Sequence, residues 1–345
     1  MGGPAGTHRP ASNQEELGVD HRRLGKTGYE ISAIGFGAWP IGSDYGPTDD
    51  ATSLAALHAA ADAGVTFFDT ADVYGDGRSE RVIGRFLKER PGERLVVATK
   101  IGQRVPLDVA NYSAAAFRGW VDDCRTNLQV ERLDLVQLHC LAPAIYYRPD
   151  LFEAMDRLVQ AGVIAHYGVS VEKVEEALKA IEYPGVASVQ IIFNILRQRP
   201  LDRFFAEAAS RDVGIIARVP LASGLLSGKF TAASTFDSTD HRSYNRHGEE
   251  FDVGETFAGV DFETGLAIVE ELRPLVPAGA TLAQLALRWI LMHEAVSAAI
   301  PGAKTPDQAR ANAAAADLAP LDAATMARID EIYVAQVKPL VHQRW

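Results

Sequence analysis

Cysteine is scarce in this 345-residue sequence, and long apolar runs are missing from it. The only two cysteines, Cys124 and Cys140, lack the CxxC or CxxH spacing of a metal or redox motif. We therefore expect reduced thiols in a cytoplasmic protein, and no metal site. Because no run is long and apolar enough to span a bilayer, the sequence also predicts that the protein does not insert into a membrane.

Positive charge is in deficit as well. The sequence has 34 Lys and Arg residues against 45 Asp and Glu, which gives a formal net charge of −11. An acidic chain is a poor partner for nucleic acids and anionic lipids, so we expect small-molecule partners, with room for a local basic pocket that holds a phosphate. The content of hydrophobic residues, 47%, is that of a globular enzyme with an ample core.

The first 20 residues are polar and contain Gly, Pro and Asn, without the apolar segment of a signal peptide. We expect residues 1–20 to form a disordered tail. The rest of the chain, residues 21–345, is expected to form one domain, since α/β barrels of this size fold as single units.

Eight short apolar segments that are typical of buried strands alternate with helical patterns. The expected strands are 34–37, 66–70, 96–100, 135–139, 166–170, 189–193, 214–218 and 298–302. Amphipathic helices are expected at 51–63, 79–89, 114–128 and 149–161. Eight strands alternating with helices predict an α/β fold of the (β/α)₈ TIM-barrel type.

Three further features refine this fold. The turn-like Gly25-Lys26-Thr27-Gly28 predicts an N-terminal hairpin over residues 21–32 that plugs the barrel floor. The rival fold, a doubly wound open sheet, would carry G-x-G-x-x-G after its first strand, and residues 35–40 lack the third glycine. The long loop between strands seven and eight, residues 231–259, is expected to be a functional lid or a mobile insertion.

Four polar residues end or follow three successive strands: Asp69, Tyr74, Lys100 and His139. In a closed barrel the carboxyl ends of the strands meet at one face, and this face carries the catalytic groups of such enzymes. The four side chains are therefore expected to converge.

The chain resembles the aldo-keto reductases, and among them the bacterial NADPH-dependent barrel enzymes. The resemblance covers nearly everything from residue 21 onward and rests on several motifs in order. They are residues 35–39, 69–75, 99–100, 138–140 and 168–170, Gln190 with Asn194, residues 220–229 and residues 300–304. It implies reduction of an aldehyde or ketone to an alcohol by hydride transfer from NADP(H), with Asp69, Tyr74, Lys100 and His139 as the catalytic tetrad.

Reduction of a carbonyl builds negative charge on its oxygen, so the site must supply a proton or strong donors. Tyr74 is the expected acid, and a nearby Lys100 ammonium would lower the pKa of its phenol. Asp69 would hold Lys100 charged and in place, and His139 would orient the carbonyl oxygen.

The resemblance also implies cofactor contacts from the later strands. Ser170 and Gln190 would bind the nicotinamide carboxamide, with Asn194 in the same neighbourhood. The family commonly has Ser-Asn where this chain has Ser170-Val171, so one amide contact is missing or replaced. Arg218 stands where an aromatic ring often stacks on the nicotinamide, and its guanidinium could stack there or face a phosphate or an acidic substrate.

A glycine-containing loop and the start of a late helix are expected to hold the rest of the cofactor. The expected contacts are Pro220, Leu221, Gly224, Leu226, Gly302, Lys304, Gln308 and Asn312. Lys304 is the candidate for the 2′-phosphate, which favours NADP(H) over NAD.

Aromatic residues of the mouth loops, Trp39, Tyr45 and Tyr146, are expected to line a substrate pocket. Tyr146 and Tyr147 could instead pack a loop, residues 241–247 could be a lid or a solvated loop, and residues 342–345 could reach the mouth of the barrel or form a frayed end.

Three alternative functions remain: a polyol or sugar dehydrogenase with the same tetrad, a nicotinamide-binding redox sensor like relatives that associate with potassium channels, and a barrel lyase or isomerase.

Overall fold

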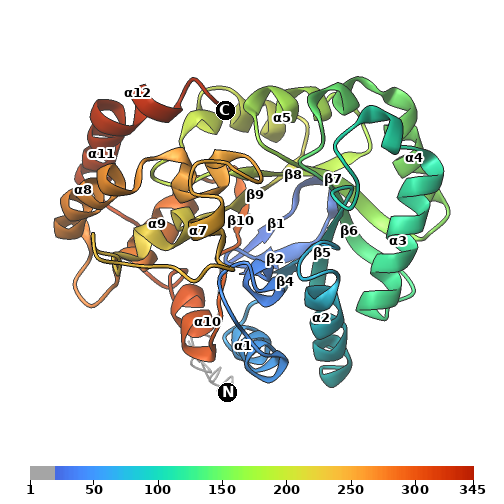
Figure 1. Cartoon of the computed structure of the whole chain (residues 1–345), viewed down its shortest axis with the longest axis horizontal. Helices are drawn as coiled ribbons and strands as arrows, with labels where there is room; N and C mark the ends of the chain where they lie inside the picture. The colour runs from blue at the N-terminus through green and yellow to red at the C-terminus, as the bar shows by residue number, and fades with distance from the viewer. Residues whose placement is uncertain (1–19) are drawn as a thin grey trace, which may run out of the picture.

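The computed structural model describes residues 20–345, with eight parallel strands at its centre (Figure 1). The expected tail lies outside the described residues, apart from Asp20. The strands are β3 (Phe36–Gly37), β4 (Phe67–Asp69), β5 (Val96–Ile101), β6 (Leu133–His139), β7 (Ile164–Val171), β8 (Val186–Ile192), β9 (Gly214–Arg218) and β10 (Val296–Ala299). Each pairs with its sequence neighbour, and parallel bridges from Ile34 to Ala299 and from Gly37 to Gly302 join the last strand to the first. The predicted (β/α)₈ barrel is confirmed.

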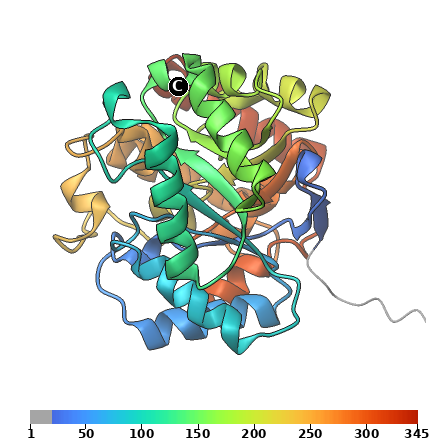
Figure 2. The ribbon, with the colours of Figure 1, turned by 90° about the vertical axis from the view of Figure 1, so that its right-hand side faces the viewer.

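Helices surround the strands (Figures 1 and 2). They are α1 (Asp50–Asp62), α2 (Arg78–Glu89), α3 (Ala114–Leu128), α4 (Pro149–Gln160), α5 (Val174–Ala180), α6 (Phe204–Ser210), α8 (Phe262–Leu272), α9 (Leu282–Leu291), α10 (Pro306–Ala313), α11 (Ala323–Ile332) and α12 (Lys338–Val341). Several begin at a capping side chain that accepts a backbone N–H of the first turn: Asp49, Ser113, Thr281, Thr305 and Asp322.

The predicted element boundaries differ from the observed ones most at the eighth strand. The prediction was 298–302, whereas β10 ends at Ala299. Pro301 has no N–H for a strand ladder, which explains the early end. The four predicted helices begin and end within one residue of the observed ones.

The N-terminal hairpin closes the amino-terminal end of the barrel. Strands β1 (His21–Arg23) and β2 (Glu30–Ser32) pair antiparallel, and they lie at the centre of the view in Figure 1. Leu24 and Ile31 are fully buried against inward-facing side chains of the strands, among them Phe67. Gly25, at φ +47°, fits because a Cβ there would lie 2.2 Å from the backbone nitrogen of Gly214. The predicted plug is confirmed.

The connection from β9 to β10 is long and folds across the mouth of the barrel. Within it lie the 3-10 helices η6 (Ala222–Ser227), η7 (Val253–Glu255) and η8 (Phe257–Gly259) and the short helix α7 (His241–Tyr244). The backbone N–H of His241 donates to the carbonyl of Asp44 at 2.9 Å, and the Tyr244 hydroxyl donates to the Asp44 carboxylate at 3.0 Å. The segment 241–247 therefore packs onto the loop after β3 and is not a freely solvated loop. Among residues 20–345, no helix has the length and apolar character needed to cross a bilayer.

Candidate active site at the carboxyl ends of the strands

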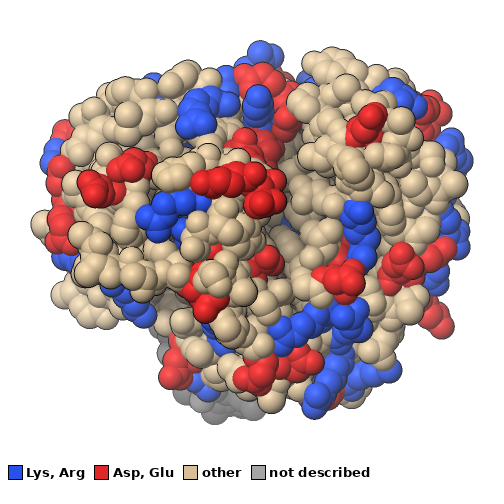
Figure 3. Space-filling view, in the orientation of Figure 1, with Lys and Arg blue, Asp and Glu red and all other residues tan. Residues whose placement is uncertain are grey.

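A cleft of about 590 Å³ opens at the carboxyl ends of the strands. Figure 3 shows this face hollowed near its centre, with acidic and basic side chains around the hollow. Most of the predicted site residues line the cleft: Trp39, Tyr45, Asp69, Tyr74, His139, Ser170, Gln190, Arg218, Pro220, Leu221, Gly224, Gly302, Lys304, Gln308 and Asn312. Four others lie outside its lining: Lys100, Asn194, Leu226 and Tyr146.

Lys100 lies directly beneath the cleft in a buried ion pair. Its ammonium is 2.5 Å from Asp69 Oδ1 and donates to the Thr70 carbonyl at 2.8 Å and to the Tyr74 hydroxyl at 3.2 Å. The Lys100 and Asp69 side chains are only 1% and 3% exposed, so each charge depends on the other for compensation. The ends of β4 and β5 therefore bring a cation, its counter-ion and a phenol together.

Two glutamines hold the other oxygen of Asp69. Gln137 Nε2 donates to Asp69 Oδ2 at 3.1 Å, and Gln190 Nε2 donates to it at 2.7 Å. Gln137 is not among the predicted site residues, although a signal was present. It is a polar residue inside an apolar strand, two positions before His139, and alternate residues of a strand face the same side.

The Tyr74 phenol is protonated at neutral pH. Its burial raises its pKa well above the ordinary value, and the charges of Asp69 and Glu255 raise it further, while Arg218 lowers it. The net shift of this pKa is upward, because burial disfavours the phenolate and Asp69 lies 2.5 Å from the Lys100 ammonium that is expected to lower it. Because Lys100 donates to the phenol oxygen, the phenol proton is left to donate toward the cleft.

His139 is a neutral imidazole beside this phenol. Burial lowers its pKa well below the usual value, and the cations Lys100 and Arg218 lower it further. Its ring lies edge-on to the Tyr74 ring, with centroids 5.9 Å apart. A neutral imidazole carries one N–H and one acceptor nitrogen, so it can orient a polar group without adding charge.

Trp39 forms an aromatic wall next to Tyr74. The two rings stack at 6.0 Å, and the Trp39 indole N–H donates to Asp44 at 3.0 Å. Tyr45 meets the indole edge-on at 5.2 Å, and His241, which the long loop contributes, lies 4.7 Å from it. One side of the cleft is therefore apolar and rigid.

The opposite side carries a buried charged group around Arg218. The guanidinium pairs with Glu172 at 3.1 Å and with Glu255, and it donates to the Val171 carbonyl at 2.9 Å. Burial raises the pKa of Glu255 to about 8 despite Arg218, with Glu172 adding to the rise. Arg218, Glu172 and Glu255 all line the cleft, and we call them the charged trio.

Neither glutamate of the charged trio is among the predicted site residues. Glu172 follows Ser170 by two residues, a spacing that places both on one face of a strand end. Glu255 comes from the long loop, where the sequence has no periodic pattern to mark it. Cys140, Glu172 and Glu255 have side-chain atoms close enough together to hold a metal ion, and within residues 20–345 they are the one such group. The Arg218 guanidinium contacts Cys140 and already supplies positive charge to this group.

The far end of the cleft lies beside α10. Lys304 Nζ donates to the Tyr45 carbonyl at 2.9 Å, across the cleft mouth, and its backbone N–H donates to Gln308 at 2.8 Å. Asn312 donates to the Gly302 carbonyl at 3.2 Å. A cation, two amide side chains and a glycine therefore meet at this end of the cleft.

Three predicted residues lie outside the cleft lining and contact other parts of the fold. Asn194 donates to the Val219 carbonyl and accepts from the Leu196 N–H, each at 2.8 Å, so it ties two loops together. Leu226 and Tyr146 are fully buried. The backbone carbonyl of Tyr146 accepts a hydrogen bond from the Tyr183 hydroxyl, as expected if Tyr146 packs a loop.

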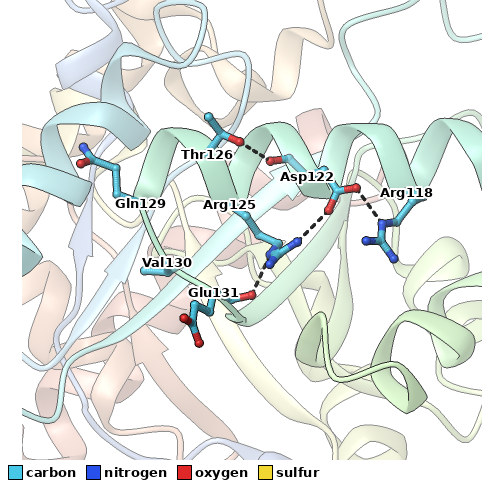
Figure 4. A pocket seen from close by; sticks show the side chains of 7 residues that line it. All are labelled: Arg118, Asp122, Arg125, Thr126, Gln129, Val130 and Glu131. Carbon is cyan, nitrogen blue, oxygen red and sulfur yellow. Dashed lines mark hydrogen bonds and ion pairs between the residues drawn. The ribbon is translucent and has the colours of Figure 1, made fainter.

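A second hollow of about 550 Å³ lies on the surface of α3 (Figure 4). Arg118 and Arg125 both pair with Asp122 there, at 2.7 and 2.9 Å. Its cations already have their counter-ion, and it holds no group suited to catalysis.

A model described as "Aldo/keto reductase family" matches residues 33–334. The aldo-keto reductase YhdN of Bacillus subtilis is 29% identical over 303 residues, 85% of this chain and 87% of that protein. The glycerol dehydrogenase AKR11B4 from Gluconobacter oxydans has a TM-score of 0.75 at 28% identity and covers 92% of this chain and 96% of its own. An aldo/keto reductase from Klebsiella pneumoniae, solved with NADP and acetate, has a TM-score of 0.68 at 25% identity and covers 91% and 95%.

Proposed function

The chain belongs to the aldo/keto reductase family, and from this premise we propose that it interconverts a carbonyl compound and an alcohol by direct hydride transfer with NADP(H). The observation that carries the proposal is the Tyr74 hydroxyl, which lies on the cleft wall 3.2 Å from an ammonium that is itself paired with Asp69. A proton donor, its supporting cation and a counter-ion are the groups that carbonyl reduction needs.

The cleft fits a dinucleotide. Its volume of about 590 Å³ is that of a ligand pocket, and its lining runs from Tyr74 to Asn312. The loop after β9 has positive φ at Ala222, Ser223 and Gly224, and it forms tight turns at the cleft in which the N–H groups of Ala222 and Gly224 donate to the carbonyls of Val219 and Leu221. We assign Pro220, Leu221 and Gly224 to the pyrophosphate.

Each tetrad residue has a defined task in this proposal. NADPH supplies the hydride when it is bound. Tyr74 gives its phenol proton to the oxygen that gains negative charge, and Lys100 stabilises the phenolate that remains. Asp69 keeps Lys100 charged, and the neutral His139 orients the carbonyl oxygen.

The nicotinamide end is assigned to Ser170 and Gln190. The amide nitrogen of Gln190 is bonded to Asp69, which leaves its carbonyl oxygen to accept from a carboxamide N–H. Gln190 would thereby link the position of the nicotinamide to the Asp69–Lys100 pair.

Replacing Lys304 by alanine is expected to weaken NADPH binding by about tenfold, the loss of a single charge-assisted contact, and to leave NADH binding unchanged. We assign the Lys304 ammonium to the 2′-phosphate, which NADH lacks. Arg310→Ala is the matched control, since Arg310 lies on α10, which follows Lys304 in the chain, and pairs with Asp307 at the surface. Fluorescence titration with both nucleotides measures the effect. An equal loss for NADPH and NADH would show that Lys304 acts only through its bond to Tyr45.

A second candidate is a polyol dehydrogenase that runs the same chemistry oxidatively. The similarity to a glycerol dehydrogenase supports it, as does the charged trio in the lining. Oxidation requires Tyr74 to accept a proton, and its raised pKa makes the phenolate rare at neutral pH, so this direction is favoured by alkaline pH.

The test of the proposed function is titration of the purified protein with NADPH, followed by loss of the NADPH absorbance when aldehydes are added. Binding with turnover supports a reductase. Binding without turnover on any carbonyl favours the polyol dehydrogenase or a sensor, and absence of binding refutes the proposal. The two buried thiols, Cys124 and Cys140, suit the cytoplasmic location that we also propose.

A further inference from the structure

Tyr74 lies on a tight turn, residues 71–77, between the end of β4 and the start of α2. The backbone N–H of Asp72 donates to the carbonyl of Lys100 at 3.1 Å, and two residues later the Tyr74 hydroxyl reaches the Lys100 ammonium. Positive φ angles at Gly75, Asp76 and Gly77 then lead the chain into α2. The position of the phenol therefore depends on what holds this turn against the barrel.

On the side that faces β3, the turn is held by close packing and by Arg78. A Cβ on Gly42 would lie 2.8 Å from the backbone nitrogen of Gly75, so the two chain segments touch. Arg78, the first residue of α2, donates to the Ile41 carbonyl at 3.1 Å and to the Thr48 carbonyl at 3.0 Å. This side of the turn is therefore fixed to the loop after β3.

On the side that faces β5, a single side chain makes the contacts. Arg104, three residues beyond the end of β5, donates to the Asp72 carbonyl at 2.5 Å and to the Asp76 carboxylate at 2.7 Å. Its Nε also lies 3.2 Å from the Asp72 carboxylate. Asp72 and Asp76 lie two residues before and two residues after Tyr74, so one guanidinium holds the turn on both sides of the phenol.

The two carboxylates that Arg104 contacts are unequal. The Asp76 side chain is 89% exposed, and an exposed ion pair contributes little. The Asp72 side chain is only 1% exposed, and neither of its carboxylate oxygens has a hydrogen-bond partner among residues 20–345. Asp72 therefore depends on the positive charge of Arg104 far more than Asp76 does.

The surroundings of Asp72 oppose its negative charge. Burial raises the pKa of Asp72 to about 7, Arg104 acts against this rise, and the buried Glu80 adds to it. Thr99 and Asn127 donate to Glu80, so these donors serve the neighbouring carboxylate. Without Arg104 the pKa of Asp72 would rise further, and the group would be neutral at neutral pH. Loss of Arg104 would then release the turn without leaving a buried charge, so we expect the fold to persist.

The loop that carries Arg104 is itself part of the cleft wall. Gln103 lines the cleft, whereas Arg104 is outside the lining. The Tyr112 hydroxyl donates to the Gly102 carbonyl at 2.9 Å, which fixes the start of the loop. Arg104 therefore joins a fixed piece of the wall to the turn that carries Tyr74.

We propose that Arg104 is a positioning residue, which pairs with Asp72 and thereby holds the turn 71–77 so that the Tyr74 hydroxyl stays between Lys100 and the cleft. The proposal rests on the proposed function, because it concerns the acid of the same site.

Four variants test the pair. Arg104→Met removes the guanidinium and keeps the aliphatic part of the side chain, and Arg104→Lys keeps the charge with fewer donors. Asp72→Asn removes the buried charge at the same size. Arg81→Met is the matched control, since Arg81 donates to the Asp76 carbonyl of the same turn from the exposed face of α2.

We expect Arg104→Met to lower the single-turnover rate of reduction by about tenfold, because a small misplacement of a catalytic group slows the chemical step. The aldehyde is the one that wild type reduces fastest. NADPH affinity and the KM for the aldehyde should be unchanged. Arg104→Lys should recover part of the loss, and Arg81→Met should match wild type.

A double-variant cycle shows whether Arg104 acts through Asp72. Asp72→Asn should lower the same rate by a smaller factor, because Arg104 keeps its bond to the backbone carbonyl. Adding Asp72→Asn to Arg104→Met should cause no further loss, since the pair is already broken.

Fluorine NMR gives a readout that needs neither cofactor nor turnover. With 3-fluorotyrosine in place of Tyr74, the cofactor-free protein should give one sharp signal. Arg104→Met should broaden or split this signal, because the released turn lets the ring adopt other positions, and Arg81→Met should leave it unchanged. Circular dichroism checks that each variant folds. If Asp72→Asn does not fold, Arg104→Lys and the NMR signal decide the matter.

The inference is overturned if folded Arg104→Met keeps the wild-type single-turnover rate, or if it changes only KM. It is also overturned if the losses in Arg104→Met and Asp72→Asn add, or if the fluorine signal does not change in Arg104→Met. In each of these cases turnover by wild type still supports the proposed function. If wild type binds NADPH and reduces no aldehyde, both are contradicted.

Discussion

Replacing Tyr74 by phenylalanine is expected to lower the rate of NADPH-dependent carbonyl reduction by about 10²–10⁴-fold, the usual contribution of a positioned acid. The phenol is the proton donor nearest to Lys100, and phenylalanine keeps the ring that stacks on Trp39. The fold and the NADPH affinity should therefore be unchanged. Single-turnover kinetics with saturating NADPH measures the loss, with cofactor affinity determined separately.

The exposed Tyr147, which is 68% exposed and lies outside the cleft, gives the matched control Tyr147→Phe. The pH dependence provides a second check on wild type. Because burial raises the pKa of Tyr74, the protonated acid persists through neutral and mildly alkaline pH, so reduction should not lose rate there through this group. Alcohol oxidation needs the deprotonated form and should gain rate as pH rises. Full turnover of the Tyr74→Phe enzyme would remove Tyr74 from the mechanism.

Replacing Lys100 by methionine is expected to destabilise the protein by about 3–5 kcal/mol, the cost of leaving one partner of a buried ion pair uncompensated. Asp69 would keep its bonds from Gln137 and Gln190 but would lose the cation that lies 2.5 Å away. Urea unfolding followed by circular dichroism measures the change. Activity should also be lost, because the Tyr74 phenolate would have no cation to stabilise it.

A double variant separates stability from catalysis. Lys100→Met combined with Asp69→Asn removes both charges, so most of the lost stability should return while activity does not. Arg85→Met is the control for an exposed pair, since Arg85 and Glu89 lie one helical turn apart at the surface and such pairs contribute about 0–1 kcal/mol. A Lys100 variant as stable as wild type would show that Asp69 is protonated or solvated.

The barrel and part of the cleft lining could be predicted because both follow from local sequence patterns. Strand ends carry Asp69, Lys100 and His139, and barrel closure places strand ends at one face whatever the loops do. Gln137 follows from the same alternation along a strand, and it was missed only because a single glutamine in a strand has no motif around it.

Other features depend on contacts between distant parts of the chain. Glu255 reaches Arg218 from a loop without periodicity, and Trp345 meets Asp252 from the end of the printed sequence. The pKa of Tyr74 is raised mainly because the phenol is buried, and the depth of burial cannot be read from the sequence. Lys304 was predicted from its motif, but its bond to the Tyr45 carbonyl joins two loops that are distant in the sequence.

The most direct test of hydride transfer uses NADPH with deuterium at the transferable position of the nicotinamide. The protein is incubated with this cofactor and glyceraldehyde, and the product is analysed by mass spectrometry. The account predicts an alcohol that carries one deuterium on the former carbonyl carbon, and no such product from the Tyr74→Phe enzyme on the same timescale. An alcohol without deuterium, or no alcohol from an enzyme that has bound NADPH, would contradict it.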